Sequence, residues 1–265
     1  MISLLRFSGS LLLAATLCAG SALAASTPSR VWERTATLPA SEANQAAAAD
    51  AEFVYAITND RIAKYERNTG RRVATSTGEA RHLNSGFFWE GKLYSTHSNY
   101  PRKPERSEIK VLDTQTMQLS TFKNFGEYGG SLTWAVRDDR YWWCHFAHYG
   151  KTNTGSFLVK FDLEWQEQRR WLDPPDLMAS VNGMSLSGGV WHQGALLVTD
   201  HDHRYLYVLE VPSEGTVLRY VAKQPSPFPG QGIALDPKTG GLVGIDRKAK
   251  AVVFAEPREV KSDKP

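Results

Sequence analysis

The chain has 265 residues, of which 42% are hydrophobic, and its formal charge of +3 comes from basic residues spread along the whole sequence. Proteins that bind nucleic acids usually carry clustered basic residues, so we expect no nucleic-acid partner for this chain. Beyond Cys18 the only cysteine is Cys144, which excludes an internal disulfide in the processed chain and predicts a buried, inert thiol.

The first residues have the pattern of a secretory signal peptide. Arg6 precedes the apolar run Leu11–Leu17, and Ala22-Leu23-Ala24 matches a small-x-small cleavage site. The apolar run is too short to span a bilayer, and no later segment approaches the roughly 20 apolar residues that a spanning helix needs. We therefore predict a signal peptide over residues 1–24, no membrane span, and a periplasmic or secreted protein.

The next segments predict strands. Val31–Pro39 (VWERTATLP) alternates as a strand does, whereas Ser41–Ala51 (SEANQAAAADA) fits either a short helix capped by Ser41 or an innermost strand of a repeat. Its place in the repeat favours the strand.

Five copies of one plan follow along the chain: a lead-in rich in small residues, a strand, a turn, an apolar pair, a polar ending and a further strand. The copies read ANQAAAADAEFVYAITND, NSGFFWEGKLYSTHSN, GSLTWAVRDDRYWWCHFAH, LSGGVWHQGALLVTDHD and GQGIALDPKTGGLVGIDRK. Turns such as Trp89-Glu90-Gly91-Lys92 carry hairpin residues. The spacing of about 40–55 residues suits blades of four antiparallel strands.

These repeats predict an all-β chain folded as a five-bladed β-propeller over residues 25–257, with a six-bladed propeller as the alternative. The last copy ends at Glu256 after three strands, so we expect Val31–Pro39 to pair with Lys250–Ala255 and close the ring. Residues 258–265 (REVKSDKP) are predicted to be a disordered, charged tail.

Polar side chains recur where strands meet loops, and in a propeller such positions face one mouth of the central channel. Counted from the first residue of each apolar pair, the residues four and six positions later lie on one face of a strand. This spacing places Asp200 on the same side as Asp202 and His201 on the opposite side. The candidate catalytic residues are His82, His97, His148, Asp200, Asp202 and Asp246. The candidate ligand-binding residues are Asn84, Ser85, Asn99, Tyr100, Glu127, Ser131, Tyr149, His201 and Gln231.

Imidazoles and carboxylates at this density suit general acid–base chemistry, or a divalent metal such as Ca, Zn or Mg, for which His97, His148 and Asp202 are the candidate ligands. The same side chains equally suit hydrogen bonds between turns and blades. The chain has no G-x-S-x-G elbow, no H-E-x-x-H and no phosphate-binding loop.

The repeat resembles exported bacterial propellers of the broad NHL, SMP-30 and lactonase kind, through HLNSGFFWEGKLYSTHSNYP, WWCHFAHYG and PFPGQGIALD. Phe125-Gly126-Glu127, Ser131-Leu132-Thr133 and Gly232-Ile233-Ala234 also resemble stretches of the plant-type glutaminyl cyclases, which are five-bladed propellers. That family carries an acidic residue in a Gly-Glu-Gly-Leu-Thr context. Ser131 stands at that place in this chain, and Glu127 is displaced from it.

Two hypotheses for the function follow. The first is a monomeric enzyme, of the hydrolase, lactonase or cyclotransferase kind, that acts on a small polar molecule by acid–base or metal-assisted hydrolysis or cyclisation. The second is a non-catalytic scaffold that binds a peptide, a glycan or a protein partner.

Overall fold

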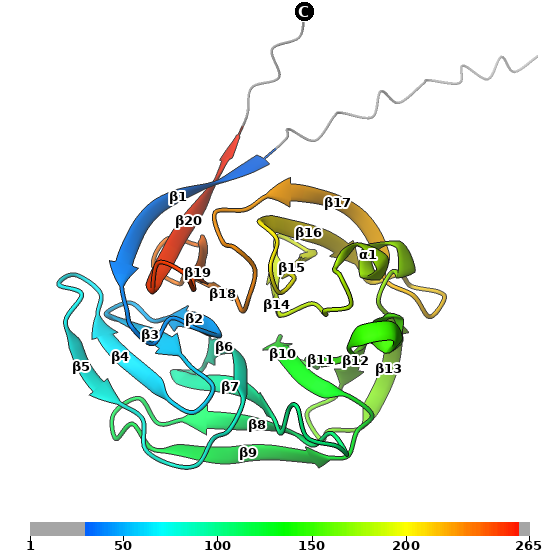
Figure 1. Cartoon of the computed structure of the whole chain (residues 1–265), viewed down its shortest axis with the longest axis horizontal. Coiled ribbons are helices and arrows are strands. Elements are labelled where there is room, and N and C mark those ends of the chain that lie inside the picture. The colour runs from blue at the N-terminus through cyan, green and yellow to red at the C-terminus, as the bar shows by residue number, and fades with distance from the viewer. Residues whose placement is uncertain (1–29, 260–265) are drawn as a thin grey trace, which may run out of the picture.

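Five four-stranded antiparallel sheets stand as blades around a central axis in the computed structural model, which describes residues 30–259 (Figure 1). The all-β, five-bladed propeller predicted from the repeats is confirmed. The predicted signal peptide, residues 1–24, lies outside the described residues.

The elements alternate regularly between strand and turn. In chain order they are β1 (Arg30–Pro39), β2 (Ala46–Ala49), β3 (Phe53–Ile57), β4 (Ile62–Glu66), β5 (Arg72–Thr75), β6 (Leu83–Trp89), β7 (Lys92–Ser98), β8 (Ser107–Leu112), β9 (Leu119–Gly126), β10 (Ser131–Arg137), β11 (Trp142–Ala147), η1 (Gly150–Gly155), β12 (Phe157–Phe161), β13 (Glu167–Leu172), α1 (Pro175–Ser180), β14 (Gly188–His192), β15 (Ala195–Thr199), β16 (Tyr205–Glu210), β17 (Arg219–Pro225), β18 (Ala234–Leu235), β19 (Leu242–Asp246) and β20 (Ala251–Glu259).

Each of the first four blades is a consecutive run of four strands, β2–β5, β6–β9, β10–β13 and β14–β17, and the first strand of each run is innermost. The inner hairpins close through the turn chemistry that the sequence indicates. Glu90 and Gly91 both have positive φ (47° and 76°), as do Gln193 and Gly194 (51° and 81°). Two consecutive positive φ values match the twist of the flanking strands, and the second position favours glycine.

The fifth blade combines both ends of the described chain in the order β18, β19, β20 and β1 (Figure 1). The predicted closure is confirmed, with Pro39 opposite Ala251 and Arg30 opposite Glu259. β20 therefore continues to Glu259, beyond the boundary at 257 drawn from the sequence, because β1 supplies pairing partners for Arg258 and Glu259. The pairing joins both ends of the described chain in one sheet and so closes the ring of blades.

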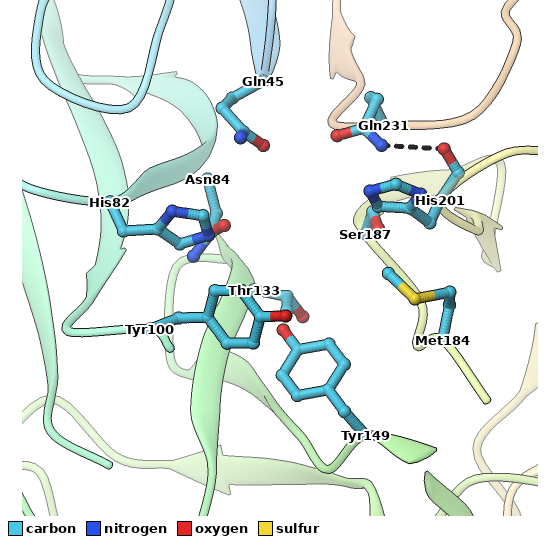
Figure 2. Close-up of a pocket in the computed structure, with 10 residues that line it drawn as sticks. All are labelled: Gln45, His82, Asn84, Tyr100, Thr133, Tyr149, Met184, Ser187, His201 and Gln231. Atoms are coloured by element: carbon cyan, nitrogen blue, oxygen red, sulfur yellow. Dashed lines mark hydrogen bonds between the residues drawn. The ribbon is translucent and has the colours of Figure 1, made fainter. Parts of the chain in front are cut away.

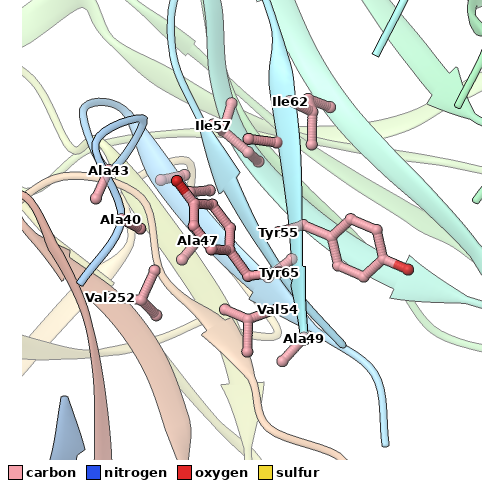
Figure 3. Close-up of a cluster of buried hydrophobic side chains, with 14 of the residues drawn as sticks. Ala40, Ala43, Ala47, Ala49, Val54, Tyr55, Ile57, Ile62, Tyr65 and Val252 are labelled. Carbon is pink, nitrogen blue, oxygen red and sulfur yellow. The ribbon is translucent and has the colours of Figure 1, made fainter. Parts of the chain in front are cut away.

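The apolar core lies between blades rather than in the hub. One cluster joins side chains of the fifth, first and second blades, among them Ala47 of β2, Val54 of β3 and Val252 of β20 (Figure 3). The segment Ala46–Ala49 is the innermost strand that the repeat favoured over a helix, and its four alanines are fully buried. Cys144 is a free, buried thiol, and burial raises its pKa, which agrees with the predicted inert role.

Small residues let the innermost strands approach one another at the hub. A Cβ placed on Gly189 would lie 2.7 Å from the indole of Trp134, and one on Gly232 would lie 2.6 Å from the Cβ of Ala46. The helical segments η1 and α1 lie in loops of the third and fourth blades. None of the helices between residues 30 and 259 is long and apolar enough to cross a membrane.

Candidate functional site

A polar pocket lies at the end of the hub where the innermost strands begin (Figure 2). We call it the mouth pocket. Its void totals about 490 Å³, including the part open to solvent. All five blades contribute to its lining, which consists of Gln45, His82, Asn84, Tyr100, Thr133, Tyr149, Met184, Ser187, His201 and Gln231.

Two kinds of loop deliver these side chains. The first kind leads into an innermost strand and carries Gln45, His82, Ser187 and Gln231; the second joins the second and third strands of a blade and carries Tyr100, Tyr149 and His201. Gly230 and Gln231 hold the fifth loop against the fourth blade. Both have positive φ (76° and 72°), and a Cβ on Gly230 would lie 2.6 Å from the carbonyl of His201.

Gln231 is fixed by that contact. Its backbone N–H donates to the carbonyl of Asp200 at 2.8 Å, and its Nε2 donates to the carbonyl of His201 at 2.7 Å. Figure 2 shows the second bond as a dashed line, with the amide oxygen on the side that faces Gln45. The side chain thus presents an acceptor to the pocket.

The stretch Asp200-His201-Asp202-His203 separates into a buried turn and one pocket-facing imidazole. The Asp200 carboxylate is buried and accepts from the backbone N–H groups of Asp202 and His203, from the His203 ring and from the hydroxyl of Tyr207. His201 lines the pocket, and its Nδ1 lies 2.8 Å from Asp202 Oδ1. When Nδ1–H donates to Asp202, the lone pair of the neutral ring is on Nε2, where a general base needs it.

Three rings form the opposite wall. Tyr100 contacts His82 and Tyr149 at centroid separations of 5.2 and 4.9 Å. Burial lowers the pKa of His82, which keeps that imidazole neutral at pH 7. Burial, with the neighbouring Tyr100 adding to it, raises the pKa of Tyr149, so this hydroxyl stays protonated and can donate a hydrogen bond.

Amide side chains complete the lining. Asn84 donates through Nδ2 to the carbonyl of Leu132 at 2.8 Å, which leaves its Oδ1 for a ligand. Gln45 donates to Oδ1 of Asn59 at 2.5 Å. The lining side chains therefore offer amide, hydroxyl and imidazole groups, and none of them is a carboxylate or a cation of lysine or arginine.

A buried chain of polar groups leads inward from Thr133. Its Oγ1 lies 2.7 Å from His145 Nδ1, and His145 Nε2 lies 2.8 Å from Oδ2 of Asp173. His145 and Asp173 are both fully buried, and the imidazole stacks on Trp134 with ring planes 3° apart. The order hydroxyl, imidazole, carboxylate is that of a nucleophile with its base and orienting acid.

A count of protons argues against a nucleophilic Thr133. Its hydroxyl also lies 2.9 Å from the carbonyl of Leu186, so one proton faces two acceptors unless His145 Nδ1 is protonated. When Nδ1–H donates to Thr133 and Thr133 donates to Leu186, the hydroxyl has one donor and one acceptor, and the 2.8 Å contact of Nε2 with Asp173 Oδ2 requires one further proton, on the ring or on the carboxyl. The hydroxyl proton is then held by the backbone, and Thr133 offers the pocket a lone pair.

The structure brings six of the predicted site residues together in the mouth pocket: His82, Asn84, Tyr100, Tyr149, His201 and Gln231. The predicted gathering of His97, His148, Asp200, Asp202 and Asp246 with His82 is not found. His97 and Asp246 lie in the second strand of a blade, where side chains point to the faces of the sheet rather than to the axis, whereas His148, Asp200 and Asp202 lie in the loops after that strand.

His97 shows this most clearly. It lies opposite Glu108 in the sheet and accepts the backbone N–H of Arg81 through Nε2 at 3.0 Å. Together with Asn99, it lines a separate charged groove on the second blade. Asn99 holds the 100–106 loop by accepting from the N–H of Arg106 at 2.8 Å and donating to the carbonyl of Pro104 at 2.9 Å.

The other predicted residues have structural contacts. Asp246 accepts from the N–H of Ala249 and forms an ion pair with Arg204. Glu127 is exposed and forms an ion pair with Arg106. His148 lies beside Gly155 and Phe157, and Ser85 is buried against Gly232. Ser131 is buried, and its side chain interacts with the hydroxyl of Tyr149.

The predicted metal ligands His97, His148 and Asp202 lie apart. Within residues 30–259, no group of three or more His, Cys, Asp or Glu side chains is arranged to hold a metal ion.

Sequence reasoning missed Gln45, Thr133 and Met184 as lining residues, and it missed the pair His145 and Asp173 behind Thr133. Gln45 precedes β2 as Gln231 precedes β18. It would have been found if the residues before the innermost strand of the weak first repeat had also been taken as site candidates. Nothing in the sequence marks Asp173, because the blade sheet brings it to His145 from 28 positions away.

With this geometry established, comparisons with known proteins show the fold alone. No protein-family model matches the chain, and no curated protein is significantly similar to it in sequence. Among solved structures, the chain is similar to glutaminyl cyclase from Myxococcus xanthus, with a TM-score of 0.60 and 11% identity over 88% of this chain and 98% of that one. It is also similar to a Thermus thermophilus protein named as an oxidoreductase (glucose dehydrogenase), with a TM-score of 0.51 and 9% identity over 86% of this chain and 100% of that one.

Proposed function

We propose that the chain is an exported enzyme that hydrolyses or cyclises a small polar carbonyl compound in the mouth pocket. The observation that carries this proposal is the convergence of His201, positioned by Asp202, with neutral hydrogen-bonding side chains from all five blades. Export, and kinship with the NHL, SMP-30 and lactonase propellers, remain predictions from the sequence.

Each group has a part in this chemistry. His201 Nε2 removes a proton from the attacking water or amine and returns it to the leaving group. The protonated hydroxyl of Tyr149 donates to the oxygen on which negative charge develops. The amide oxygens of Asn84 and Gln231 accept from N–H or O–H groups of the substrate.

The neutral lining favours an uncharged reacting centre, such as an amide or a lactone. The similarity in fold to a glutaminyl cyclase makes an N-terminal glutaminyl peptide the first compound to test. No side chain that lines the pocket is a carboxylate, and Glu127 is outside it, so the base for any cyclisation would be an imidazole.

The experiment measures turnover of a glutaminyl dipeptide by ammonia release, and of a γ-lactone by acid release, with the purified chain. If one is turned over, we expect His201→Ala to lower kcat/KM by about 10²–10⁴-fold, the usual contribution of a general acid–base group. His203→Ala is the matched control, because it removes an imidazole from the same loop but outside the pocket. An equal loss in both variants would contradict the proposal.

The scaffold hypothesis predicts a different result. A non-catalytic chain would bind the dipeptide or the lactone without turning it over, and His201→Ala would then weaken binding without any chemistry to abolish. Calorimetric titration of both variants with the same two compounds separates the hypotheses.

A further inference from the structure

A second hollow lies at the opposite end of the hub. The innermost strands that begin at the mouth pocket end here: Thr133 lines the first site and Arg137 the second, four residues or roughly 13 Å further along β10. Four blades supply its walls, through residues that include Phe88, Trp89, Val190, Trp191 and Leu235. We call it the far mouth; its void is about 1170 Å³, including open space.

The far mouth differs in chemistry from the mouth pocket. Its walls are indole, phenyl and aliphatic side chains, and Leu235 is 45% exposed there. An open concavity lined by aromatic side chains is the usual form of a site for an apolar ligand body.

Arg137 places a positive charge among these rings. The guanidinium carbon lies 4.7 Å from the ring centroid of Trp89 and 5.4 Å from that of Trp142. Within residues 30–259, no Asp or Glu forms an ion pair with Arg137. The acid in the wall, Asp236, is already paired with Arg67 and accepts from its own turn.

Three N–H donors at this hollow lack acceptors. They are Nε of Arg137 and the indole nitrogens Nε1 of Trp89 and Trp191, each buried without a partner in the described part of the chain. Buried donors without partners are rare and unfavourable, so an acceptor oxygen that reaches these N–H groups would be stabilised.

We propose that the far mouth binds an amphiphilic carboxylate, with the apolar body against Trp89, Trp191 and Leu235 and the carboxylate paired with Arg137. A planar carboxylate suits a guanidinium in bidentate geometry. The ligand is either a free aryl or acyl acid or the C-terminal carboxylate of an apolar peptide. This site is separate from the proposed enzymatic one and does not depend on it.

The test compares matched probes by calorimetric titration of the full chain. The first pair is 4-phenylbutanoate and its uncharged amide; the second is N-acetyl-Leu-Phe with a free or an amidated C-terminus. We expect the acids to bind at least ~10-fold more tightly than the amides, as a charge-assisted pair should. Tighter binding of the peptide acid identifies a chain terminus as the ligand, and tighter binding of phenylbutanoate identifies a free acid.

Arg137→Met should remove the preference for the acids and leave binding of the amides within about twofold, since the apolar wall remains. Arg140→Met is the matched control, because it removes the same charge from the adjacent exposed turn. If Arg137→Met fails to fold, Leu235→Glu at the exposed rim tests the same point and should weaken binding of the acids by ~10-fold. His201→Ala should leave binding of the probes at the far mouth unchanged.

Three results would overturn the inference: no binding of any probe, equal binding of acids and amides, or equal losses in Arg137→Met and Arg140→Met. The indole N–H signals in NMR spectra give an independent reading. Saturation with phenylbutanoate should shift the signals of Trp89 and Trp191, assigned through their Phe variants, and a shift confined to other tryptophans would place the ligand elsewhere.

Discussion

His97 is a histidine held neutral by its surroundings. Burial, and then the charge of Lys110, lower its pKa from 6.5 to about 4, while Glu108 acts in the opposite direction. The neutral ring accepts the N–H of Arg81, and this bond fixes the loop that leads to His82 and the mouth pocket. His97 is therefore a structural histidine that holds the loop of His82, a lining residue of the mouth pocket.

This environment predicts a loss of stability in acid. The unfolded chain protonates His97 near pH 6.5, whereas the folded chain resists until about pH 4, so its contribution is complete above pH 6.5 and is lost as the pH falls to 4. The full loss is ~3 kcal/mol at about 1.4 kcal/mol per pKa unit. Urea unfolding at pH 7 and pH 4.5 should show a smaller decrease for His97→Gln than for the original chain, because His82 and His148 titrate in both. Identical decreases would contradict the assignment.

Single residues also show where sequence reasoning fails. Alternation along a strand grouped Asp200 with Asp202 and directed His201 away from them, but in the structure His201 bonds to Asp202, Asp200 bonds to His203, and it is His201 that reaches the pocket. Alternation shows only which residues of one strand lie on the same side of it. Which side faces the axis depends on how the loop turns after the strand ends, and hydrogen bonds such as those of the buried Asp200 determine that turn.

At the scale of elements, sequence reasoning was more successful. Hairpin turns and alternation identified the repeated strands, and the short last repeat identified β1 as the strand that closes the ring. Hairpin turns and alternation depend on residues that are close in the sequence, so they can be recognised without knowledge of the tertiary structure. β1 adds more than backbone pairing, because Trp32 is 5% exposed and belongs to the core cluster that contains Leu197, Phe228 and Val253.

We predict that Trp32→Ala destabilises the whole ring, because the removed indole leaves a cavity between the fourth and fifth blades. The expected cost is about 3–5 kcal/mol, measured as the free energy of unfolding in urea. Glu33→Ala is the control on the same strand: it breaks only the exposed pair with Arg258, and its cost should stay below ~1 kcal/mol. Similar costs for both would mean that β1 is not part of the cooperative core.

At the scale of the whole molecule, the packing of the innermost strands at the hub determines the shape of the mouth pocket and of the far mouth. Innermost strands from all five blades converge there, and small residues such as Ala46, Gly189 and Gly232 permit the approach. Repeats in the sequence indicated the convergence but not which side chains meet across it, because contacts between blades depend on the angle at which each sheet stands to the next. Thr133, His145 and Asp173 all belong to the third blade and are joined within its sheet, whereas the approach of Gly189 to Trp134 depends on the angle between the third and fourth blades.

Gly189 tests the hub directly. A methyl group there would lie 2.7 Å from the buried indole of Trp134, which stacks on His145 with a centroid separation of 5.0 Å. At that distance Gly189→Ala must displace the buried ring, and with it the imidazole that contacts Thr133. We expect a loss of about 1–3 kcal/mol in the free energy of unfolding, as for other overpacked cores.

Gly155→Ala separates this steric effect from the general consequence of replacing glycine. Its Cβ would lie 3.6 Å from the nearest atom of His148, an ordinary contact, and its φ is not in the left-handed region. Because alanine also restricts the unfolded chain, the control should be neutral or slightly stabilised. Since the displaced imidazole also reorients Thr133, Gly189→Ala should in addition weaken ligand binding at the mouth pocket and leave the far mouth unaffected. An unchanged stability in Gly189→Ala would show that the hub is looser than its contacts indicate.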